Sequence, residues 1–258
     1  MKKLFSFFFV IVVFSIPLFA QEEGTEPEKE YSHPLRTKIG GAGGVTPIVT
    51  MFDNAGLDKF LGNAGLPKLG TDPVYLIGGE GYGYIMFIKN VRMGGFGVSG
   101  SRTVSLLQNS GGGTLKKEVE YGISYGGFLV DYVVPVTYKV DVALGASIGG
   151  GSINVRMTRD DGSFKDWTDL WNKYGDVSSA SGNYTRHLTG SFGVFNPHVS
   201  VEYTLLTWLQ LRVGAGYPIF FSPDWKLDDK FTLDGVPSKI KANGYTINAG
   251  IMFGFFGW

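Results

Sequence analysis

Apolar and polar residues alternate with a period of two along most of the chain. In segment 208–221, Leu211 and Val213 share one face, whereas Gln210 and Arg212 share the other. This alternation is typical of β-strands, whose neighbouring side chains point to opposite faces. The second face combines charged residues with glycine, as expected for the narrow interior of a closed barrel.

Alternating segments recur eight times, and their connections alternate in length. The predicted strands are 36–50, 74–88, 91–107, 116–132, 137–157, 187–204, 208–221 and 243–256. Short turns fall near 89–90, 133–136 and 205–207, and long loops at 51–73, 108–114, 158–186 and 222–242. The pattern predicts an all-β, antiparallel transmembrane β-barrel of eight strands, with short periplasmic turns and long extracellular loops.

The apolar face changes parity inside two of these strands. The change lies between Tyr125 and Phe128 in one strand and between Ile148 and Ile153 in the next. Glycine pairs stand at both places, Gly126-Gly127 and Gly149-Gly150. An extra residue in a strand reverses its alternation, so we predict β-bulges there.

The first twenty residues predict export. A short basic start is followed by an apolar run, with Ala20 before Gln21, which is the organisation of a secretory signal peptide; a retained membrane anchor is the alternative. We therefore expect a signal peptide at 1–20, a polar periplasmic leader at 21–35 and the barrel at 36–258.

Composition narrows the classes of function. The 23 basic residues match the 23 acidic ones, so there is no basic excess for a nucleic-acid partner. Cysteine is absent, which excludes disulfides and thiolate metal sites. No phosphate-binding loop or metal motif stands out, and we expect no cofactor and no metal.

The last strand has the most specific signal. Asn248, Gly250, Phe253 and Phe255 fit the pattern of polar, glycine and spaced hydrophobic residues with which outer-membrane barrels end, and Trp258 closes a short extension beyond it. In this feature the chain resembles small bacterial outer-membrane β-barrels of the OmpA/OmpX kind. The resemblance implies location in the bacterial outer membrane, contact with its lipid and lipopolysaccharide, and insertion by the barrel-assembly machinery.

Charged residues on the polar face predict a network inside the barrel. Glu202 and Arg212 are equidistant from the turn between their strands, so an antiparallel hairpin brings them together. Asp131 with Lys139 or Asp141 occupies the corresponding place in another hairpin. Four further residues take the same parity: Lys38, Arg92, Glu118 and Glu120. Charges in so narrow a space must pair or stay hydrated, which predicts a closed, salt-bridged lumen.

One group on this face suggests chemistry. His198, Ser200 and Glu202 form an HxS pair with a nearby acid, which resembles the active-site dyad of outer-membrane lipid A deacylases. The group lies near a predicted periplasmic turn, far from the leaflet that holds lipid A. A hydrogen-bonded network in the lumen is therefore the favoured interpretation of these catalytic candidates.

Two long loops contain apolar residues at helical spacing. Leu57, Phe60 and Leu61 predict a short helix in the first long loop. A longer aromatic stripe consists of Trp167, Leu170, Trp171 and Tyr174. We expect these helices to cap the barrel mouth or to lie along the membrane interface.

These features predict an outer-membrane barrel with a structural, adhesive or surface-interaction role and a closed lumen. A small channel or porin-like transport protein is the first alternative, and a lipid-modifying enzyme is the second. The sequence does not identify an extracellular partner.

Overall fold

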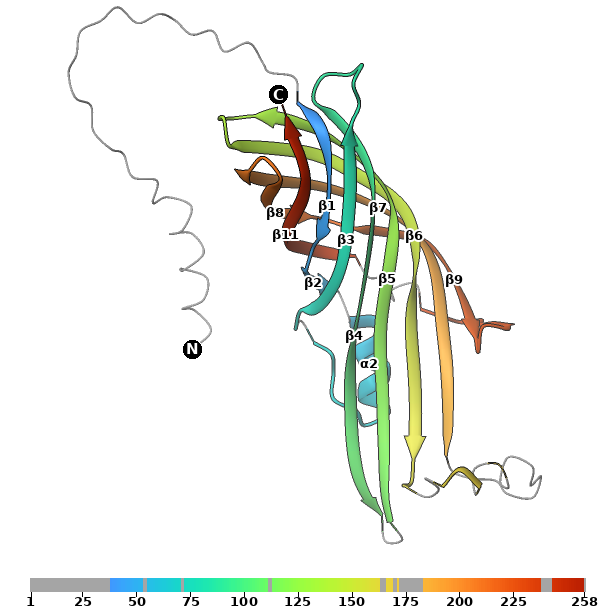
Figure 1. The fold of residues 1–258 in the computed structure, drawn as a ribbon. Helices are drawn as coiled ribbons and strands as arrows, with labels where there is room; N and C mark the ends of the chain where they lie inside the picture. The colour runs from blue at the N-terminus through green and yellow to red at the C-terminus, as the bar shows by residue number, and fades with distance from the viewer. Residues whose placement is uncertain are drawn as a thin grey trace, which may run out of the picture. The chain divides into compact units, whose positions relative to one another are not determined.

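The computed structural model describes residues 38–52, 55–70, 72–110, 113–162, 166–168, 171, 183–237 and 243–257. Figure 1 shows the fold. The strands are β1 (Ile39–Val45), β2 (Ile48–Phe52), β3 (Val74–Tyr84), β4 (Val91–Ser110), β5 (Gly113–Pro135), β6 (Val140–Asp160), β7 (Tyr184–Leu206), β8 (Leu209–Gly216), β9 (Ile219–Leu227), β10 (Phe231–Thr232) and β11 (Gly244–Gly257), and helix α2 spans Ala55–Asn63.

The strands form a closed antiparallel ring. β1 pairs with both β3 and β11, and β8 pairs with both β7 and β11, which closes the sheet. β1 and β2 are one run interrupted at Thr46-Pro47, and β8 and β9 are one run interrupted at Tyr217-Pro218. Apart from the two-residue β10, the described chain therefore has the eight strand runs that the alternation predicts.

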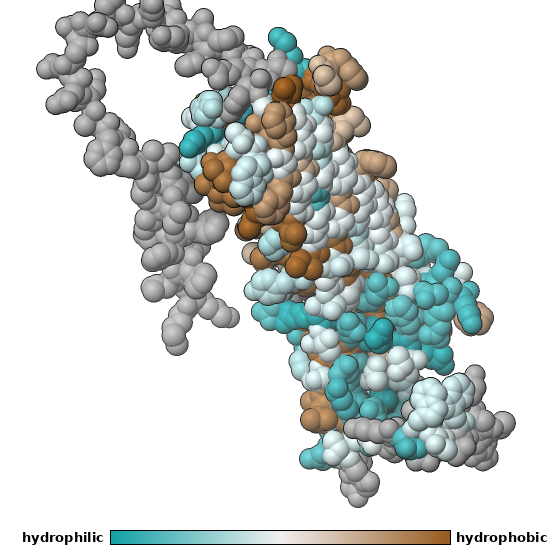
Figure 2. Space-filling view, viewed as in Figure 1, coloured by the Kyte–Doolittle hydropathy of each residue, from teal (hydrophilic) through white to brown (hydrophobic). Residues whose placement is uncertain are grey.

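An apolar belt surrounds the ring next to its short turns. On β7 the belt runs from Phe195 to Leu205, and Val199, Val201 and Tyr203 between them are each at least 41% exposed. Ten strand steps at the usual tilt rise about 25 Å, which is the height of the apolar band of an outer-membrane barrel. This belt, whose apolar side chains form brown patches among white ones in the upper part of Figure 2, is the surface that faces lipid.

Beyond the belt, four strands continue as an extension away from the short turns. β4, β5, β6 and β7 have 20, 23, 21 and 23 residues, well over the length needed to cross the bilayer. The outer face of the extension is polar, with residues such as Ser101, Thr103, Asn154 and Arg156, and it is teal and white in Figure 2. This surface is suited to water rather than lipid.

The predicted bulges at the glycine pairs were wrong. Gly126 faces Gly150 and Gly127 faces Gly149 in an unbroken register. A side chain at Gly127 or Gly149 would collide with the backbone of the adjacent strand, so these glycines permit close approach. The apolar residues change sides because the surroundings of the barrel change from lipid to water, which reverses the pattern without a bulge.

The regular register also changes the face of β5 to which Glu118 and Glu120 belong. Tyr121 and Ile123 point inward and are at most 3% exposed. Glu118 and Glu120, on the opposite face of β5, therefore lie outside, where they pair with Lys116 and Arg156. The prediction that these two glutamates face the lumen was wrong.

Helix α2 packs inside the extension. Leu57 and Leu61 are buried against the inward face of the long strands. The helix ends at Asn63, and Gly65 follows with a φ of +76°, which allows the Leu66 N–H to donate to the Leu61 carbonyl at 2.9 Å. The sequence predicted a helix either at the barrel mouth or along the membrane interface, and α2 lies at the barrel mouth.

The signal peptide at 1–20 and the leader at 21–35 lie outside the described residues, and both stay predictions. Within the described ranges, no helix has the length and apolar character needed to cross a bilayer.

Candidate functional site: the charged lumen

Eight ionisable side chains meet inside the belt, and we call them the lumen cluster. They come from the residue before β1 and from six strands, β3 to β8. The members are Lys38, Glu80, Arg92, Asp131, Asp141, His198, Glu202 and Arg212. Six of them are at most 6% exposed. Buried charges must be paired, and the pairing here is extensive.

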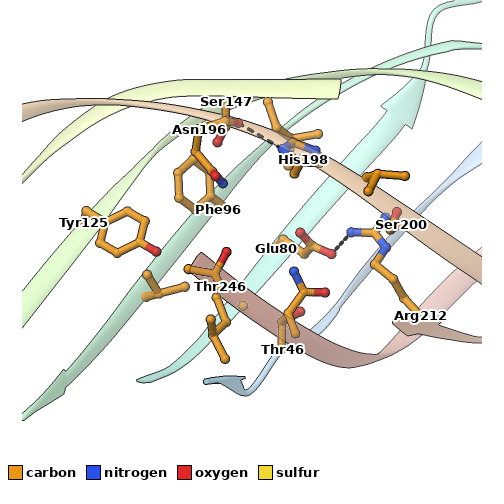
Figure 3. A pocket seen from close by; sticks show the side chains of 16 residues that line it. Thr46, Glu80, Phe96, Tyr125, Ser147, Asn196, His198, Ser200, Arg212 and Thr246 are labelled. Atoms are coloured by element: carbon orange, nitrogen blue, oxygen red, sulfur yellow. Dashed lines mark hydrogen bonds and ion pairs between the residues drawn. The ribbon is translucent and has the colours of Figure 1, made fainter. Parts of the chain in front are cut away.

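The hairpin β7–β8 supplies one pair. Glu202 and Arg212 are direct partners in its register, as the distance of each from the turn predicts. Arg212 Nε donates to Glu202 Oε1 at 2.8 Å. Arg212 also forms an ion pair with Glu80 on β3, which reaches it from the other side (Figure 3).

Arg92 on β4 stands at the centre of the lumen cluster. Its Nη1 and Nη2 donate to Glu202 Oε2 and Oε1 at 2.8 and 2.6 Å, and its Nε donates to Asp131 Oδ2 at 2.8 Å. The guanidinium lies 3.9 Å from the centre of the Tyr82 ring, a cation–π distance. Arg92 has no exposed surface. It joins β4, β5 and β7 across the lumen, which is the central role that sequence reasoning missed.

A glycine allows two strands that are not neighbours to interact. Asp131 on β5, Gly145 on β6 and His198 on β7 lie side by side in register. Because Gly145 has no side chain, His198 Nε2 reaches Asp131 Oδ1 at 2.8 Å. A Cβ at Gly145 would collide with Asp131 Oδ1.

We expect Gly145→Ala to destabilise the barrel by about 1–3 kcal/mol, because the methyl group overpacks a rigid, hydrogen-bonded site. Gly97→Ala is the matched control, since Gly97 lies on the outer face of β4 and a Cβ there meets nothing within 4 Å. Urea unfolding in lipid vesicles measures both variants. Equal losses would show that Gly145 is not needed for the Asp131–His198 contact.

The catalytic candidates do not form a dyad in this arrangement. His198 Nδ1 lies 3.2 Å from the Asn196 carbonyl oxygen, and its Nε2 is engaged by Asp131. Ser200 Oγ instead lies 3.5 Å from Glu202 Oε1. The contacts of His198, Ser200 and Glu202 are those of a hydrogen-bonded network.

Lys139 is not part of the lumen cluster. The turn between β5 and β6 is displaced toward the C-terminus from its predicted place, so Lys139 lies in the turn and is exposed. Lys38 takes the role expected of it, with Nζ 2.8 Å from Asp141 Oδ2. The prediction for Lys139 was wrong because a small shift of the turn changes which residues belong to the strand.

A small polar cavity of about 50 Å³ adjoins the lumen cluster (Figure 3). Its lining includes Thr46, Asn196 and Asn248, whose side-chain oxygens Oγ1, Oδ1 and Oδ1 are buried without a protein partner. The cavity is large enough for water, and polar groups of this kind bind it. Farther from the short turns the lumen becomes apolar, and the Phe220 ring packs 4.5 Å from Phe192.

The proposed insertion signal lies on the last strand. Phe253 and Phe255 point outward and are 53% and 62% exposed, whereas Gly250 is buried and Asn248 is half-buried. Both phenylalanines therefore belong to the apolar belt.

The aromatic stripe is only partly described. Trp167 and Trp171 are helical and exposed, and their rings lie 5.7 Å apart. Leu170 and Tyr174 lie outside the described residues. Among the residues that are described, no group of histidine and acidic side chains has the arrangement of a metal site.

Comparisons with known proteins find likeness of fold only. No family model and no curated protein matches the sequence. The chain is similar to Ail, the attachment invasion locus protein of Yersinia pestis, whose structure contains the heparin analogue sucrose octasulfate. The identity is 10% over 85% of this chain and 99% of that one, with a TM-score of 0.39.

Two further solved structures show a similar likeness. A major outer membrane protein from Thermus thermophilus is 10% identical over 83% of this chain and 99% of that one, with a TM-score of 0.42. The outer membrane protease OmpT from Escherichia coli is 8% identical over 86% and 95%, with a TM-score of 0.31. It is the closed antiparallel ring with its exposed apolar belt that makes the fold an outer-membrane β-barrel.

Proposed function

We propose that this outer-membrane barrel is closed to solutes and has a structural, adhesive or surface-interaction role. The observation that carries the proposal is the lumen cluster, in which Arg92 binds carboxylates from two other strands across the lumen. An eight-stranded barrel has room for little more than its own side chains. The barrel-assembly machinery binds the last strand, which contains Phe253 and Phe255, when it inserts the protein.

We expect no stable unitary currents when the refolded chain is reconstituted in planar bilayers. Ion movement would require the Arg92–Glu202 contacts to break, and both side chains are fully buried. A general porin in the same bilayers serves as the positive control. Stable, reproducible single-channel steps from this chain would favour the transport alternative instead.

The surface role requires the extension to lie outside the cell. Because the chain has no cysteine, single cysteines provide a clean test. We expect Thr103→Cys, on the exposed outer face of the extension, to react with a membrane-impermeant maleimide on intact cells.

Leu144→Cys is the matched control for this labelling. Leu144 also faces outward and is 52% exposed, but it lies in the apolar belt. Lipid should protect it until detergent is added. Labelling of Leu144→Cys but not of Thr103→Cys on intact cells would reverse the assignment of belt and extension.

A further inference from the structure

A second, larger cavity lies inside the extension, away from the lumen cluster. It has a volume of about 330 Å³ and lies between α2, the inward faces of β5 to β7, and the segment after β10. Apolar side chains form nearly all of its wall. The main ones are Leu57, Phe60, Leu61, Val155, Met157 and Trp225.

The apolar stripe of α2 is only partly used by the protein's own packing. Leu57 and Leu61 are buried, but Phe60, on the same stripe and in the cavity wall, is 48% exposed. Trp225 contributes to the wall from β9 and is only 6% exposed. Protein interiors are normally packed without such spaces. An apolar space of this volume falls within the range of ligand pockets, at its lower end.

Two cations stand at the rim of the cavity. Lys117 on β5 and Arg159 on β6 are direct partners in the register, and each lies two residues beyond a wall residue, Val119 or Met157, on the same face. Lys117 Nζ lies 3.4 Å from the carbonyl oxygen of Ala64, another residue of the wall.

The acids near these cations are engaged elsewhere or lie apart. Glu118 pairs with Lys116 on the outer face, and Asp228 pairs with Arg186. Asp234, in the wall after β10, is exposed. Within the described ranges no carboxylate forms an ion pair with Lys117 or Arg159. Like charges directly opposite each other in a sheet are unfavourable, and an anion between them relieves the repulsion.

We propose that this cavity binds a long-chain fatty acid, with the acyl chain against Phe60 and Trp225 and the carboxylate at Lys117 and Arg159. The apolar wall fits a hydrocarbon chain, and the small volume favours one chain over the several chains of a lipopolysaccharide. The two cations at the rim favour a carboxylate over a neutral head group.

Quenching of tryptophan fluorescence tests the proposal on the full chain in lipid nanodiscs. The probe is hexadecanoate with bromine in its acyl chain, because bromine quenches indole fluorescence at contact. We expect saturable quenching that unlabelled hexadecanoate reverses. Trp225→Phe should remove the saturable part, whereas quenching of Trp208, which is exposed at the periplasmic end of the belt, should persist.

Further variants test separately how the acyl chain and the carboxylate head group are bound. Val155→Phe fills the cavity and should abolish saturable quenching. If Val155→Phe does not fold, Met157→Phe serves as the cavity-filling variant instead. Lys117→Gln with Arg159→Gln should raise the Kd of the acid about fivefold. The Kd of the brominated alcohol of the same length should change less than twofold.

The outcomes are distinct. Absence of saturable quenching, or quenching that survives both Trp225→Phe and Val155→Phe, would overturn the proposal, because the probe would then reside in the surrounding lipid. Equal effects of the double glutamine variant on the acid and the alcohol would overturn the choice of a fatty acid.

Discussion

Arg92→Gln is expected to lower the free energy of unfolding by about 3–5 kcal/mol, the largest effect of any single substitution that we predict. The change leaves Glu202 and Asp131 buried at 0% and 2% exposure without the cation that bridges them. Glutamine retains part of the length of arginine, so the loss reflects charge and hydrogen bonding more than volume. Urea unfolding of the barrel in lipid vesicles, followed by heat-modifiable gel migration, measures it.

Arg156→Gln is the matched control for Arg92→Gln. Arg156 is also a strand arginine with a glutamate partner, but its side chain is 59% exposed and its Nη1 lies 3.6 Å from Glu120 Oε2. Exposed pairs contribute at most about 1 kcal/mol. If the two variants lost similar stability, the lumen cluster would not be what holds this barrel together.

The sequence was sufficient for the strand runs and for contacts within a hairpin. Alternation fixes which residues share a face, and a tight turn fixes which residues are opposite, so Glu202 and Arg212 could be paired in advance. Lys139 shows how sensitive this reasoning is to the turn, because a small displacement moved it from the lumen to the solvent.

Two features required knowledge of the surroundings and of the closed ring. Alternation does not reveal whether lipid or water faces a strand, so Glu118 and Glu120 were assigned to the wrong side of β5. Arg92 and Glu202 are 110 residues apart on strands that are not neighbours. Their contact depends on the curvature of the closed barrel. The alternation within a single strand does not show which distant strands meet across the lumen.

Exchanging the charges of the hairpin pair is expected to fail. If Glu202 and Arg212 interacted only with each other, Glu202→Arg with Arg212→Glu would recover part of the stability that each single change loses. The structure adds two neighbours to this pair. The new arginine at position 202 would face Arg92, and the new glutamate at position 212 would face Glu80. The double variant should therefore unfold at no higher urea concentration than the weaker single variant.

The role of Arg92 can be tested by adding Arg92→Gln to the double variant in which Glu202 and Arg212 are exchanged. Arg92→Gln should be strongly destabilising in the natural chain but neutral or stabilising in the exchanged chain, because there it removes a repulsion instead of an attraction. This reversal of sign is the expected signature of three side chains coupled at one buried point. Where a variant does not reach full folding, the folded fraction by gel migration gives the same ranking. Recovery of stability in the exchanged double variant, with Arg92 intact, would show that Arg92 does not contact Glu202 in the membrane, and the central role assigned to Arg92 would be wrong.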